Sequence, residues 1–271
     1  MLSHADKAQR FRDLHDKPGI LLLPNPWDAG TAKLLASLGF EALATTSLGM
    51  SNALGRPDGE GSVSRAELLE NCRVIAAATD LPVNADLENG YADDPKEAAA
   101  ILRDAAAVGI SGGSIEDWSG ERIYDFNHAV ERVAAGVEMA RSLDVPFVFT
   151  ARAENLIRGR RDLDDTIRRL QAFEKAGADV LYAPGLQDLS TMRTVVSEIK
   201  KPLNVVMSAG DPDLTAEQIA AVGVKRISVG GALSRLALAA FMKGARDMKD
   251  GNFKWMRETM PTSELKAVFR G

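Results

Sequence analysis

Residues 81–91 read Leu81-Pro82-Val83-Asn84-Ala85-Asp86-Leu87-Glu88-Asn89-Gly90-Tyr91. A short apolar run is followed at once by an amide and two carboxylates. Unpaired carboxylates are costly to bury, so this composition is unfavourable inside a protein core. At the end of a buried strand the same acids can hold a hard cation such as Mg²⁺, which prefers oxygen ligands. The segment therefore predicts a strand that ends at a functional site.

Short β-rich runs of this kind alternate with helix-like segments along the chain. The expected strands are residues 19–23, 42–46, 82–86, 112–116, 147–151, 180–183, 203–207 and 226–229. The expected helices are residues 29–38, 65–78, 95–108, 128–143, 163–176, 189–199 and 215–221. The strands carry few charges before their C-terminal ends, which is typical of parallel strands covered on both faces.

The boundaries of these segments carry local signals as well. Ser64 followed by Glu67 forms a capping-box pattern, and Asp94-Pro95 combines an N-cap with a proline in the first helical turn. Several helix-like runs are followed by a glycine, which often supplies the left-handed residue at a helix end: Gly39, Gly109, Gly177 and Gly223. Eight βα units in succession predict an α/β protein in which residues 1–271 form one (β/α)8 barrel domain.

Two segments fall outside this repeat. An N-terminal helix around residues 7–14 is expected to plug the barrel or to pack under it. A C-terminal helical extension over residues 250–271 carries the apolar side chains Phe253, Trp255, Met256, Met260 and Phe269. Because large exposed apolar patches are uncommon on isolated proteins, we expect this extension to pack on its own barrel or on a neighbouring subunit.

The composition limits the classes of partner. The chain has 271 residues and a net charge of −5, which disfavours nucleic acid because phosphate binding requires a basic surface. The N-terminus lacks the apolar stretch of a signal peptide, and no apolar run approaches the ~20 residues that span a bilayer. The one cysteine, Cys72, excludes an intrachain disulfide. These observations predict a cytoplasmic protein with no membrane partner.

The carboxyl ends of the expected strands carry most of the candidate site residues, as they do in enzymes with this barrel. Asp58, Asp86 and Glu116 are candidate ligands of Mg²⁺, directly or through its waters. Arg152 faces them from the fifth strand and can bind a substrate carboxylate through its planar fork.

Other strand-end residues are candidates for substrate contact and for proton transfer. The small residues after the second strand, Thr46-Ser47-Leu48, offer backbone groups to a carboxylate, and the first strand contributes Asn25 and Asp28. A carbonyl chelated by Mg²⁺ accepts electrons, which suits reactions that pass through the enolate of a 2-oxo acid. Arg152 is expected to neutralise that enolate, and the candidates for proton transfer are Glu88, Tyr91 and the loop of residues 118–126.

At these positions the chain resembles the isocitrate lyase/phosphoenolpyruvate mutase superfamily. The matching segments are Pro24-Asn25-Pro26-Trp27-Asp28-Ala29, Gly39-Phe40-Glu41-Ala42, Leu54-Gly55-Arg56-Pro57-Asp58, Asp86 with Gly90-Tyr91, Ser114-Ile115-Glu116-Asp117, Ala151-Arg152-Ala153-Glu154 and Ala176-Gly177-Ala178-Asp179. The resemblance implies a barrel that binds Mg²⁺, with Mn²⁺ as a substitute, and a small 2-oxo or 2-hydroxy carboxylate. It also implies a homotetramer, a dimer of dimers, that exchanges residues of about 233–271 between subunits.

The sequence departs from the family pattern at three places. The family's strand-3 motif usually reads Asp-x-Asp, and its first acid is aligned here with Asn84, which we expect at the metal as a ligand or a close neighbour. The loop 118–124 lacks the Lys-Cys-Gly-His signature of the isocitrate and methylisocitrate lyases, so an isocitrate-type lyase is not expected. Ala44 and Ala183 replace a tryptophan and a histidine of the mutase-like enzymes.

The predicted function is a Mg²⁺-dependent lyase that cleaves a C–C bond of a small 2-oxo or 2-hydroxy dicarboxylate through an enolate. Oxaloacetate decarboxylation and retro-Claisen or retro-aldol cleavage are reactions of this kind. Two alternatives stay open. One is a phosphonopyruvate-type mutase or hydrolase that acts on a P–C bond, and the other is a barrel that binds a 2-oxo acid without turnover.

Overall fold

A parallel β-barrel forms the centre of the computed structural model, which describes residues 2–59, 61–208, 210 and 213–270. Residues 1 and 271, the ends of the predicted domain, lie outside this part. Within it, one eight-stranded sheet has the order β1-β8-β7-β6-β5-β4-β3-β2. The strands are β1 Leu21–Leu23, β2 Leu43–Ala44, β3 Val83–Asp86, β4 Gly112–Glu116, β5 Val148–Arg152, β6 Val180–Tyr182, β7 Leu203–Val206 and β8 Arg226–Ser228.

Contacts between β1 and β2 bring the two ends of the sheet together. The backbone N–H of Ala44 donates to the carbonyl of Pro24 at 3.0 Å. The side-chain amide of Asn25 donates to the carbonyl of Thr45 at 3.0 Å and accepts from the backbone N–H of Val229 at 2.9 Å. The barrel is thereby nearly closed, and the predicted (β/α)8 fold is confirmed.

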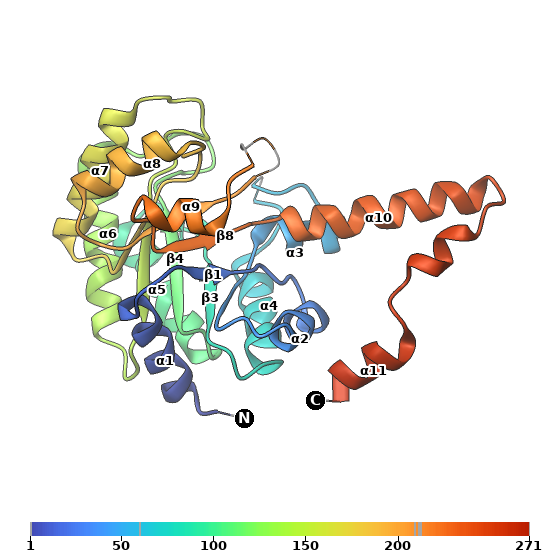
Figure 1. The fold of residues 1–271 in the computed structure, drawn as a ribbon. Coiled ribbons are helices and arrows are strands. Elements are labelled where there is room, and N and C mark those ends of the chain that lie inside the picture. Colours follow the sequence, from blue (N-terminus) through green and yellow to red (C-terminus); the bar gives the residue numbers. More distant parts are fainter. Residues whose placement is uncertain (1, 60, 209, 211–212, 271) are drawn as a thin grey trace.

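Helices surround the barrel on the outside (Figure 1). They are α2 Ala29–Ser37, α3 Ser47–Ala53, α4 Arg65–Ala77, α5 Pro95–Ala107, α6 Phe126–Arg141, α7 Leu163–Ala176, α8 Leu189–Glu198 and α9 Ala216–Ala221. The capping box of Ser64 and Glu67 opens α4, and Asp94 caps α5 as its sequence predicted. The short helix α3 was not predicted, because its serines, asparagine and glycine are common in loops.

The N-terminal helix α1, His4–Asp16, closes the lower end of the barrel, which is the end where the strands begin. Its side chains Phe11 and Leu14 are buried in one cluster with residues of the strands. A Cβ atom on Gly112 of β4 would lie 2.7 Å from the ring of Phe11, so a side chain larger than hydrogen at residue 112 would displace that ring. The prediction of a helix that plugs the barrel is confirmed.

The C-terminal residues form an arm, residues 232–270, that leaves the barrel (Figure 1). It consists of α10 Ala232–Lys249, the 3₁₀ helix η1 Lys254–Glu258 and α11 Thr262–Arg270. The end of the arm returns to the barrel, where Lys33 of α2 donates to the carbonyl of Phe269 at 3.0 Å. Many large apolar side chains of the arm are exposed: Leu236, Leu238, Phe241, Met242, Met248, Phe253, Met256, Met260 and Phe269. In the described part of the chain, none of the helices has the length and hydropathy to cross a membrane.

Candidate active site

Two adjoining cavities lie at the C-terminal ends of the strands. The larger, of about 210 Å³, extends into the barrel, and we call it the floor chamber; its lining includes Asn84, Asp86, Ser114, Asn204, Arg226 and Ser228. The smaller, of about 160 Å³, lies under the loop after β4, and we call it the loop chamber; its lining includes Glu88, Tyr91, Glu116, Trp118 and Arg158. Ser47, Asp58 and Arg152 line both chambers.

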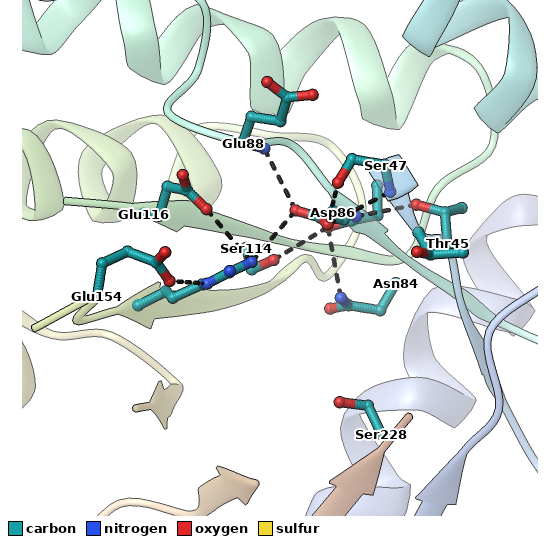
Figure 2. Close-up of polar contacts among 12 residues, drawn as sticks. Thr45, Ser47, Asn84, Asp86, Glu88, Ser114, Glu116, Glu154 and Ser228 are labelled. Atoms are coloured by element: carbon teal, nitrogen blue, oxygen red, sulfur yellow. Dashed lines mark hydrogen bonds and ion pairs between the residues drawn. The ribbon is translucent and has the colours of Figure 1, made fainter. Parts of the chain in front are cut away.

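Asp86, the last residue of β3, lies at this junction (Figure 2). One of its carboxylate oxygens accepts a hydrogen bond of 3.2 Å from the hydroxyl of Ser47 at the start of α3. The backbone N–H of Asp86 donates to the hydroxyl of Thr45 at 2.9 Å. These contacts hold the carboxylate at the rim of the barrel while leaving part of it open to the cavity.

Asp58 and Glu88 add two further carboxylates to this region. Burial, and after it the charge of Asp86, raises the pKa of Asp58 above its ordinary value. The pKa of Glu88 is raised to about 7 by burial and then by the charges of Asp86 and Asp58. The junction therefore carries an excess of negative charge, which a bound cation would relieve.

Arg152 of β5 is the cation nearest to these acids. Its guanidinium lies 3.6 Å from Asp86 and 3.3 Å from Glu116, and its Nε donates to Glu154. It also lies 5.1 Å from the ring centre of Tyr182. Burial raises the pKa of Glu116 above its ordinary value, although the charge of Arg152 opposes this. Arg152 thus joins the acids of β3, β4 and β5 into one network.

A second arginine, Arg158, extends the network toward the loop after β4. It pairs with Glu154 at 3.0 Å and with Glu116 at 3.5 Å. Its guanidinium lies 4.6 Å from the ring centre of Trp118, within the range of a cation–π contact. The buried Asp117, by contrast, pairs with Arg169 at 2.9 Å behind β4, where it has a structural role.

The predicted substrate-binding residues do not all line the chambers. Thr46, Ser47 and Leu48 line the floor chamber, and so does Asn25, although both ends of its amide already bridge strands. Asp28 does not line either chamber; its carboxylate accepts the backbone N–H of Thr31 at 2.7 Å and caps α2.

Asn84 and Asp86 point to the same interior face of β3, because side chains alternate along a strand. Asn84 therefore lies one layer deeper than Asp86, on the side toward Ser228 (Figure 2). The two rim acids separated by one residue are Asp86 and Glu88. These contacts do not test the prediction that Asn84 contacts the metal. The side chain of Asn84 lies in a layer inside the barrel, below the acids at the rim.

Three charged residues of the site were not among the predicted site residues. Glu154 was named only within a segment that matches the family, and Arg158 lies in an irregular segment with no local pattern. Arg226 is the first residue of the last strand. A charged residue at an inward-facing strand position was the sequence feature that could have indicated its place in the site. Strand residues two apart share a face, so Arg226 and Ser228 could have been placed together inside the barrel.

The side chains at the junction fit a hard divalent cation. Within the described ranges, no three acidic, histidine or cysteine side chains converge closely enough to form a closed metal site. Mg²⁺ does not require one, because it usually keeps several waters and takes one or two carboxylates. Asp58, Asp86, Glu88 and Glu116 supply only oxygen donors, and the raised pKa values of Asp58, Glu88 and Glu116 indicate unneutralised negative charge.

Comparison with known proteins agrees with this geometry. The family model described as phosphoenolpyruvate phosphomutase matches residues 11–249. The chain belongs to this family. The resemblance to the isocitrate lyase/phosphoenolpyruvate mutase superfamily is therefore confirmed, and the relatives with a named activity include a lyase.

Two solved structures illustrate the range of this family. A Burkholderia cenocepacia protein, classed only provisionally as a lyase or mutase, is 48% identical with a TM-score of 0.96, covering 99% of this chain and 97% of its own. A phosphonopyruvate hydrolase in complex with oxalate and Mg²⁺ is 26% identical with a TM-score of 0.86, covering 98% of this chain and 95% of its own.

Curated relatives add named activities on carbon–carbon bonds. The 2-methylisocitrate lyase of Bacillus subtilis is 28% identical and covers 74% of this chain and 67% of the enzyme. The oxaloacetate decarboxylase of Paraburkholderia xenovorans is 26% identical and covers 93% of this chain and 85% of the enzyme. The decarboxylase and the phosphonopyruvate hydrolase have the same sequence identity to this chain. Sequence identity therefore does not distinguish an activity on a C–C bond from one on a P–C bond, and the choice between them depends on the site.

Proposed function

We propose that this family member is a Mg²⁺-dependent lyase that cleaves a C–C bond of a small 2-oxo or 2-hydroxy dicarboxylate through an enolate. The observation that supports this most is the cluster of Asp58, Asp86, Glu88 and Glu116 around Arg152 at the mouth of a small chamber. The volume of about 210 Å³ is below the range of pockets for drug-sized ligands and suits a small acid.

The acids of the junction would hold the metal. We assign this role to Asp58, Asp86, Glu88 and Glu116, and we infer that Asp86 and Glu88 correspond to the acid pair of the family motif. When bound, Mg²⁺, or Mn²⁺ in its place, would chelate the 2-oxo acid and polarise its carbonyl.

The other residues of the junction would bind and orient the substrate. The hydroxyl and backbone of Ser47, with Thr46 and Leu48, are placed to contact the substrate carboxylate. Arg152 brings a permanent positive charge to the place where negative charge develops in an enolate, which lowers the barrier to its formation. Its contacts to three acids hold the guanidinium in one orientation.

Tyr91 is our assigned proton donor. Its hydroxyl lies in the loop chamber and is 3.5 Å from the carboxylate of Glu88. Burial raises the pKa of Tyr91 above its ordinary value, so the phenol keeps its proton at neutral pH and can deliver it to the product.

The test is turnover of a panel of 2-oxo and 2-hydroxy dicarboxylates, oxaloacetate included, by the purified protein with Mg²⁺. We expect carboxylate products that depend on the metal, and a loss of at least about a hundredfold in kcat/KM for Asp86→Asn. Asp28→Asn is the matched control, because Asp28 lies outside both chambers and asparagine is also a good N-cap.

Two outcomes would reject the C–C lyase. Phosphorus NMR that shows cleavage or rearrangement of phosphonopyruvate, with none of the dicarboxylates consumed, would assign P–C chemistry instead. Binding of oxalate by calorimetry, with no product from any panel member after prolonged incubation, would indicate a binding protein without turnover.

We also propose that the chain forms a homotetramer, a dimer of dimers, in which the arms are exchanged between subunits. The exposed apolar side chains of the arm support this, since such a surface is unfavourable in water.

A further inference from the structure

Arg226 is a buried arginine inside the barrel, and its side chain is 2% exposed. Its Nε donates to the amide oxygen of Asn204 at 2.8 Å and its Nη2 donates to the hydroxyl of Thr150 at 3.1 Å. Its Nη1 lies 3.3 Å from the Nε2 of His15 on α1. These three partners are uncharged groups, because burial and then the charge of Arg226 lower the pKa of His15 to about 3.

The other arginines inside the site differ from Arg226 in this respect. Arg152 pairs with three carboxylates and Arg158 with two. Across the described parts of the chain, Arg226 forms no ion pair with a carboxylate. Burial lowers the pKa of Arg226 to about 10, so it still carries its charge at neutral pH. A buried charge without a counter-ion is unfavourable, and a bound anion would compensate it.

The surroundings of Arg226 form a polar end to the floor chamber. Asn84, Asn204 and Ser228 line the chamber together with Arg226. The Oδ1 atom of Asn84 is buried and has no hydrogen-bond partner among the residues that the structure describes. Rotation of this amide exchanges its oxygen and its NH₂ group, so Asn84 can present either a donor or an acceptor to a ligand.

We propose that Arg226, Asn84 and Ser228 form a second anion-binding subsite, at the floor of the chamber, that takes the distal carboxylate of the substrate. This inference rests on the proposed function, which places the 2-oxo or 2-hydroxy acid end of the same molecule at the metal-binding acids above. Arg226 would then select dicarboxylates over monocarboxylates. Its unpaired charge favours this subsite over Arg158, whose charge is already balanced by Glu116 and Glu154.

Calorimetry with Mg²⁺ present tests the subsite without depending on catalysis. Malate and lactate share a 2-hydroxy acid end and differ in the distal carboxylate, whereas oxalate can chelate the metal but carries no further carboxylate beyond its chelating end. For the native protein we expect malate to bind at least about tenfold more tightly than lactate, the contribution typical of a hydrogen bond between charged groups. In Arg226→Met we expect this ratio to fall to within about threefold while oxalate affinity stays unchanged.

Matched variants separate charge from packing. Arg226→Lys keeps the charge and should retain part of the preference for malate. Thr150→Val removes a hydrogen bond to Arg226 but does not line the chamber, so its malate-to-lactate ratio should equal that of the native protein. If Arg226→Met does not fold, Asn84→Ala tests the same subsite and should weaken malate more than lactate or oxalate.

Three results would overturn the inference while leaving the proposed function in place. They are an unchanged ratio in Arg226→Met, an equal loss of preference in Thr150→Val, and a loss in Arg158→Met rather than in Arg226→Met. If the native protein with Mg²⁺ bound none of malate, lactate and oxalate, the acid-binding site of the proposed function would itself be rejected, and the subsite with it.

Discussion

The turn after β3 holds three residues in the left-handed backbone region: Glu88 at φ 50°, Gly90 at φ 80° and Tyr91 at φ 62°. For a residue other than glycine this conformation costs about 1–2 kcal/mol. Such strain persists only where surrounding contacts fix it, and it is concentrated at functional sites. Here it coincides with Glu88, which we assign to the metal, and with Tyr91, our assigned proton donor, so the positions of both depend on the turn.

Gly90→Ala should therefore destabilise the protein more than an ordinary substitution in a turn. Besides the unfavourable φ, a Cβ atom at residue 90 would lie 2.7 Å from the carbonyl oxygen of Ala98. Gly55→Ala is the matched control, because Gly55 has φ 67° and open space around it. We expect a loss of about 1 kcal/mol for Gly55→Ala and at least about 2 kcal/mol for Gly90→Ala in urea denaturation. Equal losses would show that the contact with Ala98 relaxes without cost.

His15 should make the stability depend on pH. Its pKa is lowered to about 3 in the folded protein, so between pH 6.5 and about 3 the unfolded chain binds a proton that the folded chain does not. Stability is then fully present above pH 6.5 and falls as the pH is lowered through this window, by at most about 1.4 kcal/mol per pH unit. His15→Gln should flatten the decrease in unfolding free energy measured between pH 7 and pH 5. An unchanged slope would assign the acid sensitivity to the carboxylates alone.

Individual residues were predicted with uneven success. Asp58, Asp86, Glu88 and Glu116 were found because acids at strand ends stand out in sequence, and the structure brings them together at one junction. Arg226 was not predicted as a site residue, because contacts between side chains across the barrel cannot be inferred before the register of the strands is known. The same limit explains Asp28, whose short side chain caps a helix as readily as it could line a site.

At the scale of elements, periodicity and capping were sufficient for most of the barrel. The predicted strand 112–116 matches β4, and the predicted strand 82–86 matches β3 to within one residue. The helix α3 was not predicted because its seven residues are too few to show a helical pattern. Its first residue binds Asp86, so the missed helix is part of the site.

The plug formed by α1 should contribute strongly to stability. Phe11 is fully buried among strand residues at the lower end of the barrel. Replacement of a buried phenylalanine by alanine leaves a cavity, so Phe11→Ala should cost about 3–5 kcal/mol. Chemical denaturation measures this loss, with Leu38→Ala on the barrel surface, where Leu38 is exposed, as the control that should change stability little. A cost below about 1 kcal/mol would mean that neighbouring side chains refill the site.

At the scale of the whole molecule, the arm is the segment whose apolar side chains stay exposed to solvent in a single chain. Phe241 of α10 is 69% exposed, and Leu38 on the barrel surface is 73% exposed. If copies of the chain cover the arm, Phe241→Glu should lower the assembly mass from four times 29.1 kDa, whereas Leu38→Glu should leave it unchanged. Light scattering coupled to size exclusion measures both. A native mass of one chain would reject the tetramer.

The plug of Phe11 and Leu14 also bears on the order in which products depart. Because these side chains fill the lower end of the barrel, a fragment bound beside Arg226 leaves through the same mouth by which the substrate entered. The proposed cleavage yields two fragments, and we expect the one nearer the mouth to be released first. The deeper fragment then occupies the otherwise free enzyme, so it should inhibit competitively with substrate, while the shallower one should inhibit noncompetitively.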